Sequence, residues 1–278
     1  KWRENPLFDY ADNIQLLIKV AAEKYKLDRQ NYSRYSVKRG LRNPDGTGVL
    51  AGLTSIGEVR GYIIDDGEKV PVDGDLLYRG IRVNDLVHHC RAEGRLGFEE
   101  VIFLILFGVL PDRDMLEQFT TILSNLRPLP DHFTEDIILK SPSPDIMNKL
   151  ARCILASYSF DPTPNDINLP NLMRQCIELI ARMPTMTAYA YQAKNHYYEG
   201  QSLIIHSPME NLSAAENFLH MLRPTHKYTR EEAEILDLML MLHAEHGGGN
   251  NSAFACRVVS SSGTDTYSAI AAAVGSLK

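Results

Sequence analysis

The chain has 278 residues, of which 44% are hydrophobic and 23% charged, enough to bury a core in one large domain or two smaller ones. Its net charge of −6 argues against a nucleic-acid-binding protein, because such domains are usually basic. The longest apolar run, Val101–Leu110, is shorter than the roughly 20 residues that a membrane-spanning helix needs. The first residues, Lys1–Pro6, lack the apolar core of a signal peptide. We therefore expect a soluble protein with no nucleic-acid or membrane partner.

Four cysteines are spread along the chain without a CxxC spacing: Cys90, Cys153, Cys176 and Cys256. In a chain of this length we expect them to be free thiols that pack as small hydrophobic groups. Free thiols suit a reducing compartment, which we expect to be the cytoplasm; a processed protein of the mitochondrial matrix would look similar.

The first third of the chain mixes helical and β patterns. Residues Ile14–Lys24 have helical apolar spacing, and Arg39–Gly52 is rich in glycine, proline and asparagine, which predicts a loop. Two β-rich stretches, Tyr62–Ile64 and Val70–Val72, flank Asp65-Asp66-Gly67, so we predict a hairpin there. Pro71 should restrict the second strand to a sheet edge.

After Arg82 the pattern becomes almost wholly helical, with proline-rich breaks between helices. Thr229 and Glu232 have the spacing of a capping box. No linker is long enough to separate independent domains. We expect a mainly α protein with an N-terminal helix and loop over residues 1–52, a small β element over 53–82 and a helical core over 83–278. The predicted core helices are Val83–Glu93, Phe98–Phe107, Arg113–Arg127, Asp145–Ser157, Leu169–Tyr191, Ala214–Met221 and Arg230–His246.

The segment Leu242–Ser252 is the strongest candidate for a site. The helix before it carries Ile235, Leu238, Met239 and Leu242 at helical spacing, which predicts an apolar face directed at the core. The histidines His243 and His246 end that helix. Three glycines follow, which permit left-handed backbone and a close approach of main chain to a ligand. Two imidazoles, two amides and a hydroxyl beside such a turn suit a pocket for a small polar acid.

Three interpretations of this segment remain open from the residues alone. The glycines can simply end the helix, with the histidines packed or solvated there. The histidines His243 and His246 can share a cation, although the pattern is not HExxH and no third ligand is evident, so we expect no metal. The third interpretation is a histidine that binds a substrate.

Several segments in order along the chain resemble the citrate synthase family. Leu242–Ser252 is similar to the family segment in which a histidine precedes glycines, an asparagine and a serine. The other matching segments are Leu76–Ile81 with its Tyr-Arg-Gly motif, Glu99–Pro111, Arg182–Thr185, Leu212–Leu219 and Ser260–Lys278. The resemblance implies the multi-helical large domain of that family.

The resemblance also implies the reaction, which joins acetyl-CoA to oxaloacetate and yields citrate and CoA. An aspartate removes a proton from the acyl methyl group while one histidine stabilises the enol, and a second histidine polarises the ketone. Acetyl-CoA is a substrate here, and the resemblance implies no metal or redox cofactor. The family generally forms two-fold dimers through helices of the large domain, so a homodimer is expected.

Site residues follow from the resemblance position by position. It implies that His246 binds oxaloacetate and that Asn250 helps to hold this substrate. It also implies that Ser252 supports the first catalytic histidine. His243, one turn before His246, is expected in a supporting position. In the family, a Gly-Pro-x-His motif with that catalytic histidine follows the helix that ends here at Lys278. We therefore expect no catalytic residue within this chain, with the small domain and C-terminal segment absent. By itself the chain should be an inactive fragment, unless it pairs with its own C-terminal fragment.

Two alternatives to citrate synthesis remain. A 2-methylcitrate synthase performs the same chemistry with propionyl-CoA, and nothing in the motifs above separates the two. The alternative from another class is a non-catalytic helical scaffold or regulator that keeps the fold without the chemistry. It predicts no oxaloacetate binding even when the rest of the chain is supplied.

Overall fold

The computed structural model describes residues 30, 34, 40–43, 46–49 and 52–278. The helix expected over Ile14–Lys24 lies outside the described residues. The chain divides into two compact units, residues 1–50 and 51–278. In the first unit, Arg42 and Gly48 form an antiparallel bridge, and the side chain of Asn43 donates to the Thr47 hydroxyl (2.9 Å) inside that loop.

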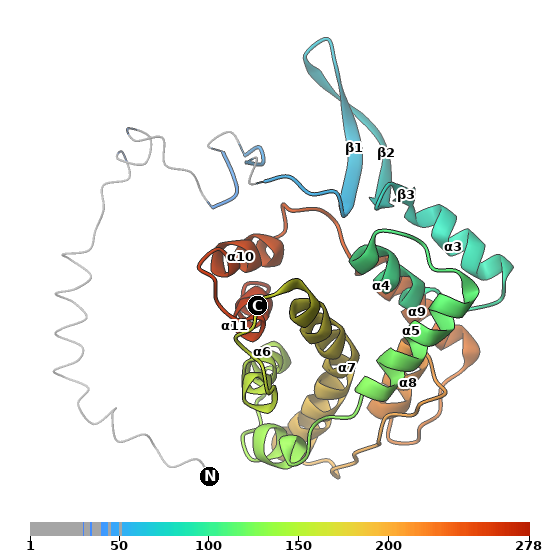
Figure 1. Ribbon diagram of the computed structural model, residues 1–278, viewed down its shortest axis with the longest axis vertical. Coiled ribbons are helices and arrows are strands. Elements are labelled where there is room, and N and C mark those ends of the chain that lie inside the picture. Colours follow the sequence, from blue (N-terminus) through green and yellow to red (C-terminus); the bar gives the residue numbers. More distant parts are fainter. Residues whose placement is uncertain (1–29, 31–33, 35–39, 44–45, 50–51) are drawn as a thin grey trace. The chain divides into compact units, whose positions relative to one another are not determined.

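The β element of the second unit is a three-stranded antiparallel sheet in the order β1 (Gly57–Asp65), β2 (Glu68–Tyr78) and β3 (Ile81–Arg82). Asp66 and Gly67, both with positive φ (45° and 84°), connect the first two strands, which is the two-residue turn that matches strand twist. The predicted hairpin is therefore confirmed, and Figure 1 shows it projecting from the helices. Pro71 faces Tyr62 of β1, whereas β3 pairs with β2 only at Leu77 and Tyr78, so Pro71 lies where β2 is an edge.

The rest of the unit is helical. Each of the predicted core helices is present, and the bounds agree within one residue except at two ends. The longest helix continues through Pro184 to Glu199, and the helix before the glycines ends at His243. The capping box of Thr229 and Glu232 is confirmed. The helices are α3 (Val83–Ala92), α4 (Phe98–Phe107), α5 (Arg113–Leu126), the π-helix η2 (Thr134–Leu139), α6 (Ile146–Ser157), the 3₁₀ turn η3 (Tyr158–Phe160), α7 (Leu169–Glu199), α8 (Ala214–Leu222), α9 (Arg230–His243), α10 (Asn251–Ser260) and α11 (Thr266–Gly275).

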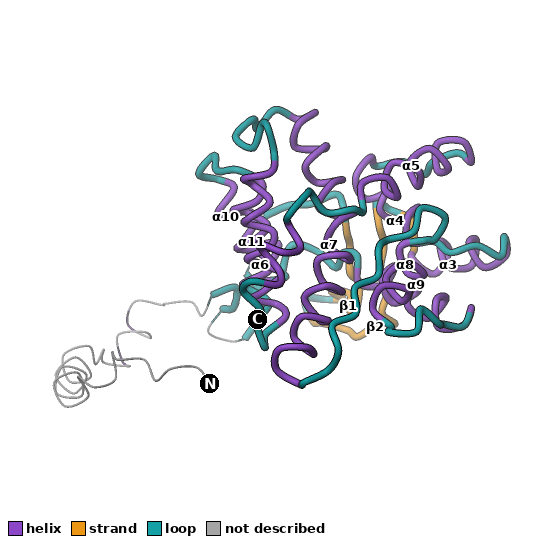
Figure 2. Tube along the Cα trace, turned by 90° about the horizontal axis from the view of Figure 1, so that it is seen from below, coloured by secondary structure: helices purple, strands orange, loops and turns teal. Residues whose placement is uncertain are grey.

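The long helix α7 lies between two groups of helices, as the ribbon in Figure 1 and the Cα tube in Figure 2 show. On one side it packs with α6 and α11 around a core that includes Cys153, Ile154, Met186 and Tyr267. On the other side α4 packs against α8 and α9, and a second core joins Tyr78 of the sheet to Val101 and Met241. The segment between α9 and α10 connects these two groups, and it is the segment singled out from the sequence.

The apolar face predicted for α9 is wrong. Ile235, Met239 and Leu242 are 60%, 51% and 40% exposed, whereas the buried positions are Ala233, Asp237 and Met241. The helix is rotated in this way because Asp237 turns inward and accepts hydrogen bonds from the backbone N–H groups of Gly97 (2.7 Å) and Phe98 (3.1 Å).

The cysteines are free thiols within the described residues, and Cys90 and Cys153 are buried. Burial raises the pKa of each of these two thiols to about 11. No helix among residues 52–278 or the shorter described stretches is long and apolar enough to cross a membrane.

Candidate functional site

The connection from α9 to α10 is a glycine turn with open space around it. Helix α9 ends at His243, and Gly247 adopts φ 93°, a left-handed conformation that glycine adopts without strain. A Cβ added at Gly247, Gly248 or Gly249 would meet no atom within 4 Å. The main chain of this turn is therefore accessible to a small ligand.

The small sheet holds the start of this turn in place. The buried Tyr78 hydroxyl donates to the carbonyl of Met241 (2.7 Å), and the N–H of Glu245 approaches the same hydroxyl (3.4 Å). Glu245 in turn accepts from the N–H of Gly247 (2.6 Å). The Glu245 side chain passes so close to Gly57 that a Cβ there would lie 2.5 Å from its Cγ. The turn is thus tied to β1 and β2 on one side.

At the other side of the turn three predicted site residues are joined. The side-chain amide of Asn250 lies 2.6 Å from Nε2 of His246. Its oxygen accepts from the backbone N–H (2.7 Å) and the hydroxyl (2.6 Å) of Ser252. Asn250 is the N-cap of α10, so the positive end of that helix dipole lies beside the imidazole. An exposed imidazole next to a helix N-terminus suits a small anionic ligand such as a carboxylate.

His243 does not join this group in the described structure. Its Nδ1 lies 2.7 Å from the carbonyl of Met239, one turn back in its own helix. The hydroxyl of Ser252 is engaged by Asn250, so the support that it was expected to give to a catalytic histidine stays a prediction. Within the described residues no three His, Cys, Asp or Glu side chains are placed to hold a metal ion.

Sequence reasoning missed the residues that position the turn. In the sequence, Tyr78 and Arg79 stand out only as part of a Tyr-Arg-Gly motif, yet the two anchor different helices. Tyr78 donates to the carbonyl of Met241 in α9, and Arg79 donates to the carbonyl of Ile105 near the end of α4 (2.8 Å). The Tyr-Arg-Gly motif marks these residues in the sequence, but it does not indicate which distant residues they contact.

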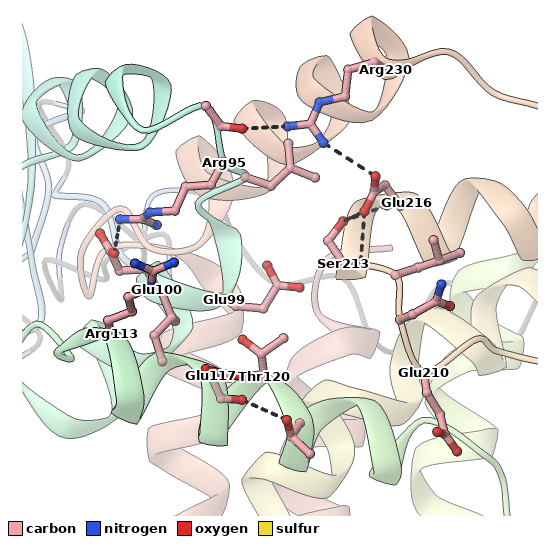
Figure 3. Close-up of a pocket in the computed structure, with 16 residues that line it drawn as sticks. Arg95, Glu99, Glu100, Arg113, Glu117, Thr120, Glu210, Ser213, Glu216 and Arg230 are labelled. Atoms are coloured by element: carbon pink, nitrogen blue, oxygen red, sulfur yellow. Dashed lines mark hydrogen bonds and ion pairs between the residues drawn. The ribbon is translucent and has the colours of Figure 1, made fainter.

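A separate pocket of about 710 Å³ lies where α4, α5, α8 and α9 begin, and it does not include the His246 turn (Figure 3). Two ion pairs join charged side chains of its lining, Arg95 with Glu100 (2.5 Å) and Arg230 with Glu216 (3.6 Å). Glu99 is buried in its wall and accepts from the N–H of Ala214 (2.6 Å), and burial raises its pKa. Glu99 and Glu216 accept from N–H groups at the start of α8, a structural role, so we place the candidate site at the glycine turn instead.

Comparison with known proteins agrees with this mainly helical fold. Residues 43–278 match the family model described as "Citrate synthase, C-terminal domain". The chain is 32% identical over 247 residues to 2-methylcitrate synthase 1 of Corynebacterium glutamicum, which covers 87% of this chain and 57% of that protein. It is 30% identical over 234 residues to the citrate synthase of Haloferax volcanii, which covers 79% of this chain and 56% of that protein.

A solved structure shows the same fold. The crystal structure of citrate synthase from Pyrobaculum aerophilum superposes with a TM-score of 0.69 at 28% identity, and the match covers 87% of this chain and 58% of that one. The chain belongs to the citrate synthase family. It spans a little over half the length of these relatives.

Proposed function

We propose that this chain supplies part of the oxaloacetate site of a citrate synthase-type acyltransferase, which condenses acetyl-CoA with oxaloacetate to give citrate and CoA. The observation that supports it most directly is the His246–Asn250 contact of 2.6 Å at an accessible glycine turn, in a chain of this family. The imidazole can donate to a carboxylate or keto oxygen of the ligand. The adjacent N-terminus of α10 favours the ligand's negative charge.

The same site serves 2-methylcitrate synthesis equally well, because that reaction changes the acyl group and keeps oxaloacetate. Relatives of both names match this chain at similar identity. The two activities are distinguished by thiol release from acetyl-CoA against propionyl-CoA in any preparation of this chain that turns over. We also propose that the protein is a homodimer, which light scattering tests by measuring its molar mass. The free thiols support a reducing compartment, the cytoplasm.

Binding of oxaloacetate, measured by isothermal titration calorimetry, tests the proposed function without requiring turnover. We expect His246→Ala to weaken binding more than tenfold, because a hydrogen bond to a charged ligand contributes about 1.5–3 kcal/mol. The matched control is His243→Ala, three residues earlier, which removes an imidazole bonded to its own helix and should leave affinity nearly unchanged. No measurable binding even when the rest of the enzyme is supplied would favour the scaffold alternative. Equal losses in the two variants would contradict the role of His246.

A further inference from the structure

The orientation of the Asn250 amide is determined by the start of α10. Asn250 is the N-cap residue, and its side-chain oxygen accepts from the backbone N–H of Ser252 at 2.7 Å. A backbone N–H can only donate, so the atom that faces it must be the amide oxygen. The Ser252 hydroxyl, 2.6 Å from the same oxygen, fits the same orientation. The nitrogen of the amide therefore faces His246.

This orientation determines which ring nitrogen of His246 can carry a proton. The amide nitrogen of Asn250 lies 2.6 Å from Nε2 of His246 and can only donate a hydrogen bond. Nε2 must then accept, so it carries no proton. The single proton of the neutral ring is left on Nδ1, since the hydrogen bond made by one ring nitrogen decides the state of the other.

We propose that Asn250 is a positioning residue that holds neutral His246 in the tautomer protonated on Nδ1. An exposed histidine in water prefers its proton on Nε2, so this contact reverses the usual state of the ring. The order of events is local: helix capping orients the amide, the amide selects the tautomer, and the tautomer leaves Nδ1–H as the ring's donor. The use of that donor for oxaloacetate rests on the proposed function, whereas the tautomer itself does not.

The tautomer can be read directly from two-bond ¹H–¹⁵N correlation spectra of the ¹⁵N-labelled chain. The spectra are recorded near pH 8.5, about two units above the usual histidine pKa of about 6.5, because only a neutral ring has a tautomer to read. His246→Gln identifies the signals among the nine histidines. We expect the protonated nitrogen of His246 to be Nδ1. A ring protonated on Nε2 in the unmodified chain overturns the proposal.

Two variants test whether Asn250 determines the tautomer of His246. Asn250→Asp keeps a good N-cap but replaces the donor by an acceptor, so the proton of His246 should move to Nε2. Ser252→Ala is the matched control, because it removes the hydroxyl but keeps the backbone N–H that orients the amide, so the tautomer should stay on Nδ1. An unchanged tautomer in Asn250→Asp, with circular dichroism showing an intact fold, would contradict the role of Asn250.

Oxaloacetate titration in the same spectra separates the two proposals. A ring with its proton on Nδ1 that does not respond to oxaloacetate refutes the proposed function and leaves the tautomer proposal standing. A ring protonated on Nε2 that does respond refutes the tautomer proposal and leaves oxaloacetate binding standing.

Discussion

The carboxylate of Asp237 lies 2.7 Å from the backbone nitrogen of Gly97, 140 positions earlier in the chain. Its second oxygen accepts from the N–H of Phe98 at 3.1 Å. A side chain in the middle of α9 thus satisfies the N–H groups that begin α4, where Gly97, the N-cap, has no side chain to do so. This contact joins α4, which packs against β2, to α9, which ends at the glycine turn.

Removing this carboxylate should destabilise the fold. Asp237 is only 4% exposed, so Asp237→Ala would leave two N–H groups without their acceptor, at a cost of about 2–4 kcal/mol in the free energy of unfolding. Urea unfolding followed by circular dichroism measures this. The control is Glu234→Ala on the exposed side of the same helix, where Glu234 pairs with Arg230 (2.8 Å). This variant should lose no more than about 0.5 kcal/mol of the free energy of unfolding, because an exposed ion pair contributes little. Equal losses would show that Asp237 has no special role in joining α9 to α4.

Asp237 also shows why the sequence predicted α9 but not its buried face. Apolar spacing at Ile235, Leu238, Met239 and Leu242 correctly indicated a helix. The periodicity weighs only hydrophobicity, and it could not register that a charged residue would be drawn inward by N–H groups on another helix. The buried face therefore contains Ala233, Asp237 and Met241, and the larger apolar side chains of the stripe remain partly or fully exposed.

The sequence named the residues of the candidate site only through the family resemblance, and it could not predict their hydrogen bonds. His246, Asn250 and Ser252 are close in sequence and were named from the family resemblance. Their hydrogen bonds depend on α10 beginning at Asn251, a helix that the polar, glycine-rich sequence did not predict. The anchor at Tyr78 joins residues 163 positions apart, a separation at which periodicity and capping patterns carry no information.

Three histidines form a cluster: His220 in α8, His206 in the segment before it and His226 in the segment after it. The ring centroids of His206 and His226 are 3.5 Å apart, and those of His220 and His226 are 4.8 Å apart and stacked. Burial lowers the pKa of His220, and the neighbouring imidazoles of His226 and His206 lower it further. Its neutral form is therefore favoured by folding. This contribution to stability is complete above the usual pKa of about 6.5 and is lost as the pH falls below it.

The melting temperature should accordingly fall as the pH is lowered from 7.5 to 5.5. The histidine cluster should account for part of the slope of melting temperature against pH. His226→Asn removes one of the imidazoles that lower the pKa of His220, so the melting temperature of this variant should depend less steeply on pH than that of the unmodified chain. Asparagine is compatible with the left-handed backbone at this position (φ 59°). Differential scanning calorimetry at several pH values measures the slopes. His132→Asn is the matched control, an exposed histidine also in left-handed backbone (φ 64°), and it should leave the slope unchanged. A shallower slope in both variants would contradict the assignment.

A buried carboxylate, Asp161, joins the loop before α7 to α7 and α11. The side chain is 1% exposed and accepts hydrogen bonds from Arg174 (2.7 Å), Gln175 (2.8 Å) and Tyr267 (2.8 Å). Burial alone would raise the pKa of Asp161, but the bond from the N–H of Thr163 and those from these side chains outweigh it and hold the pKa at about 2. The ionised carboxylate is thus stabilised by folding.

The sign of this shift predicts acid sensitivity. A lowered pKa contributes stability that is complete above the unfolded value of about 3.9 and is lost as the pH falls toward 2. At pH 7 we expect Asp161→Asn to lower the free energy of unfolding by about 2–4 kcal/mol, because Arg174 loses a buried partner. The deficit relative to the unmodified chain should narrow between pH 4 and pH 2, as measured by chemical unfolding at each pH. Asp131→Asn, at an exposed position, should stay within about 0.5 kcal/mol throughout. A deficit that is the same at pH 2 and pH 7 would show that Asp161 acts by packing rather than by charge.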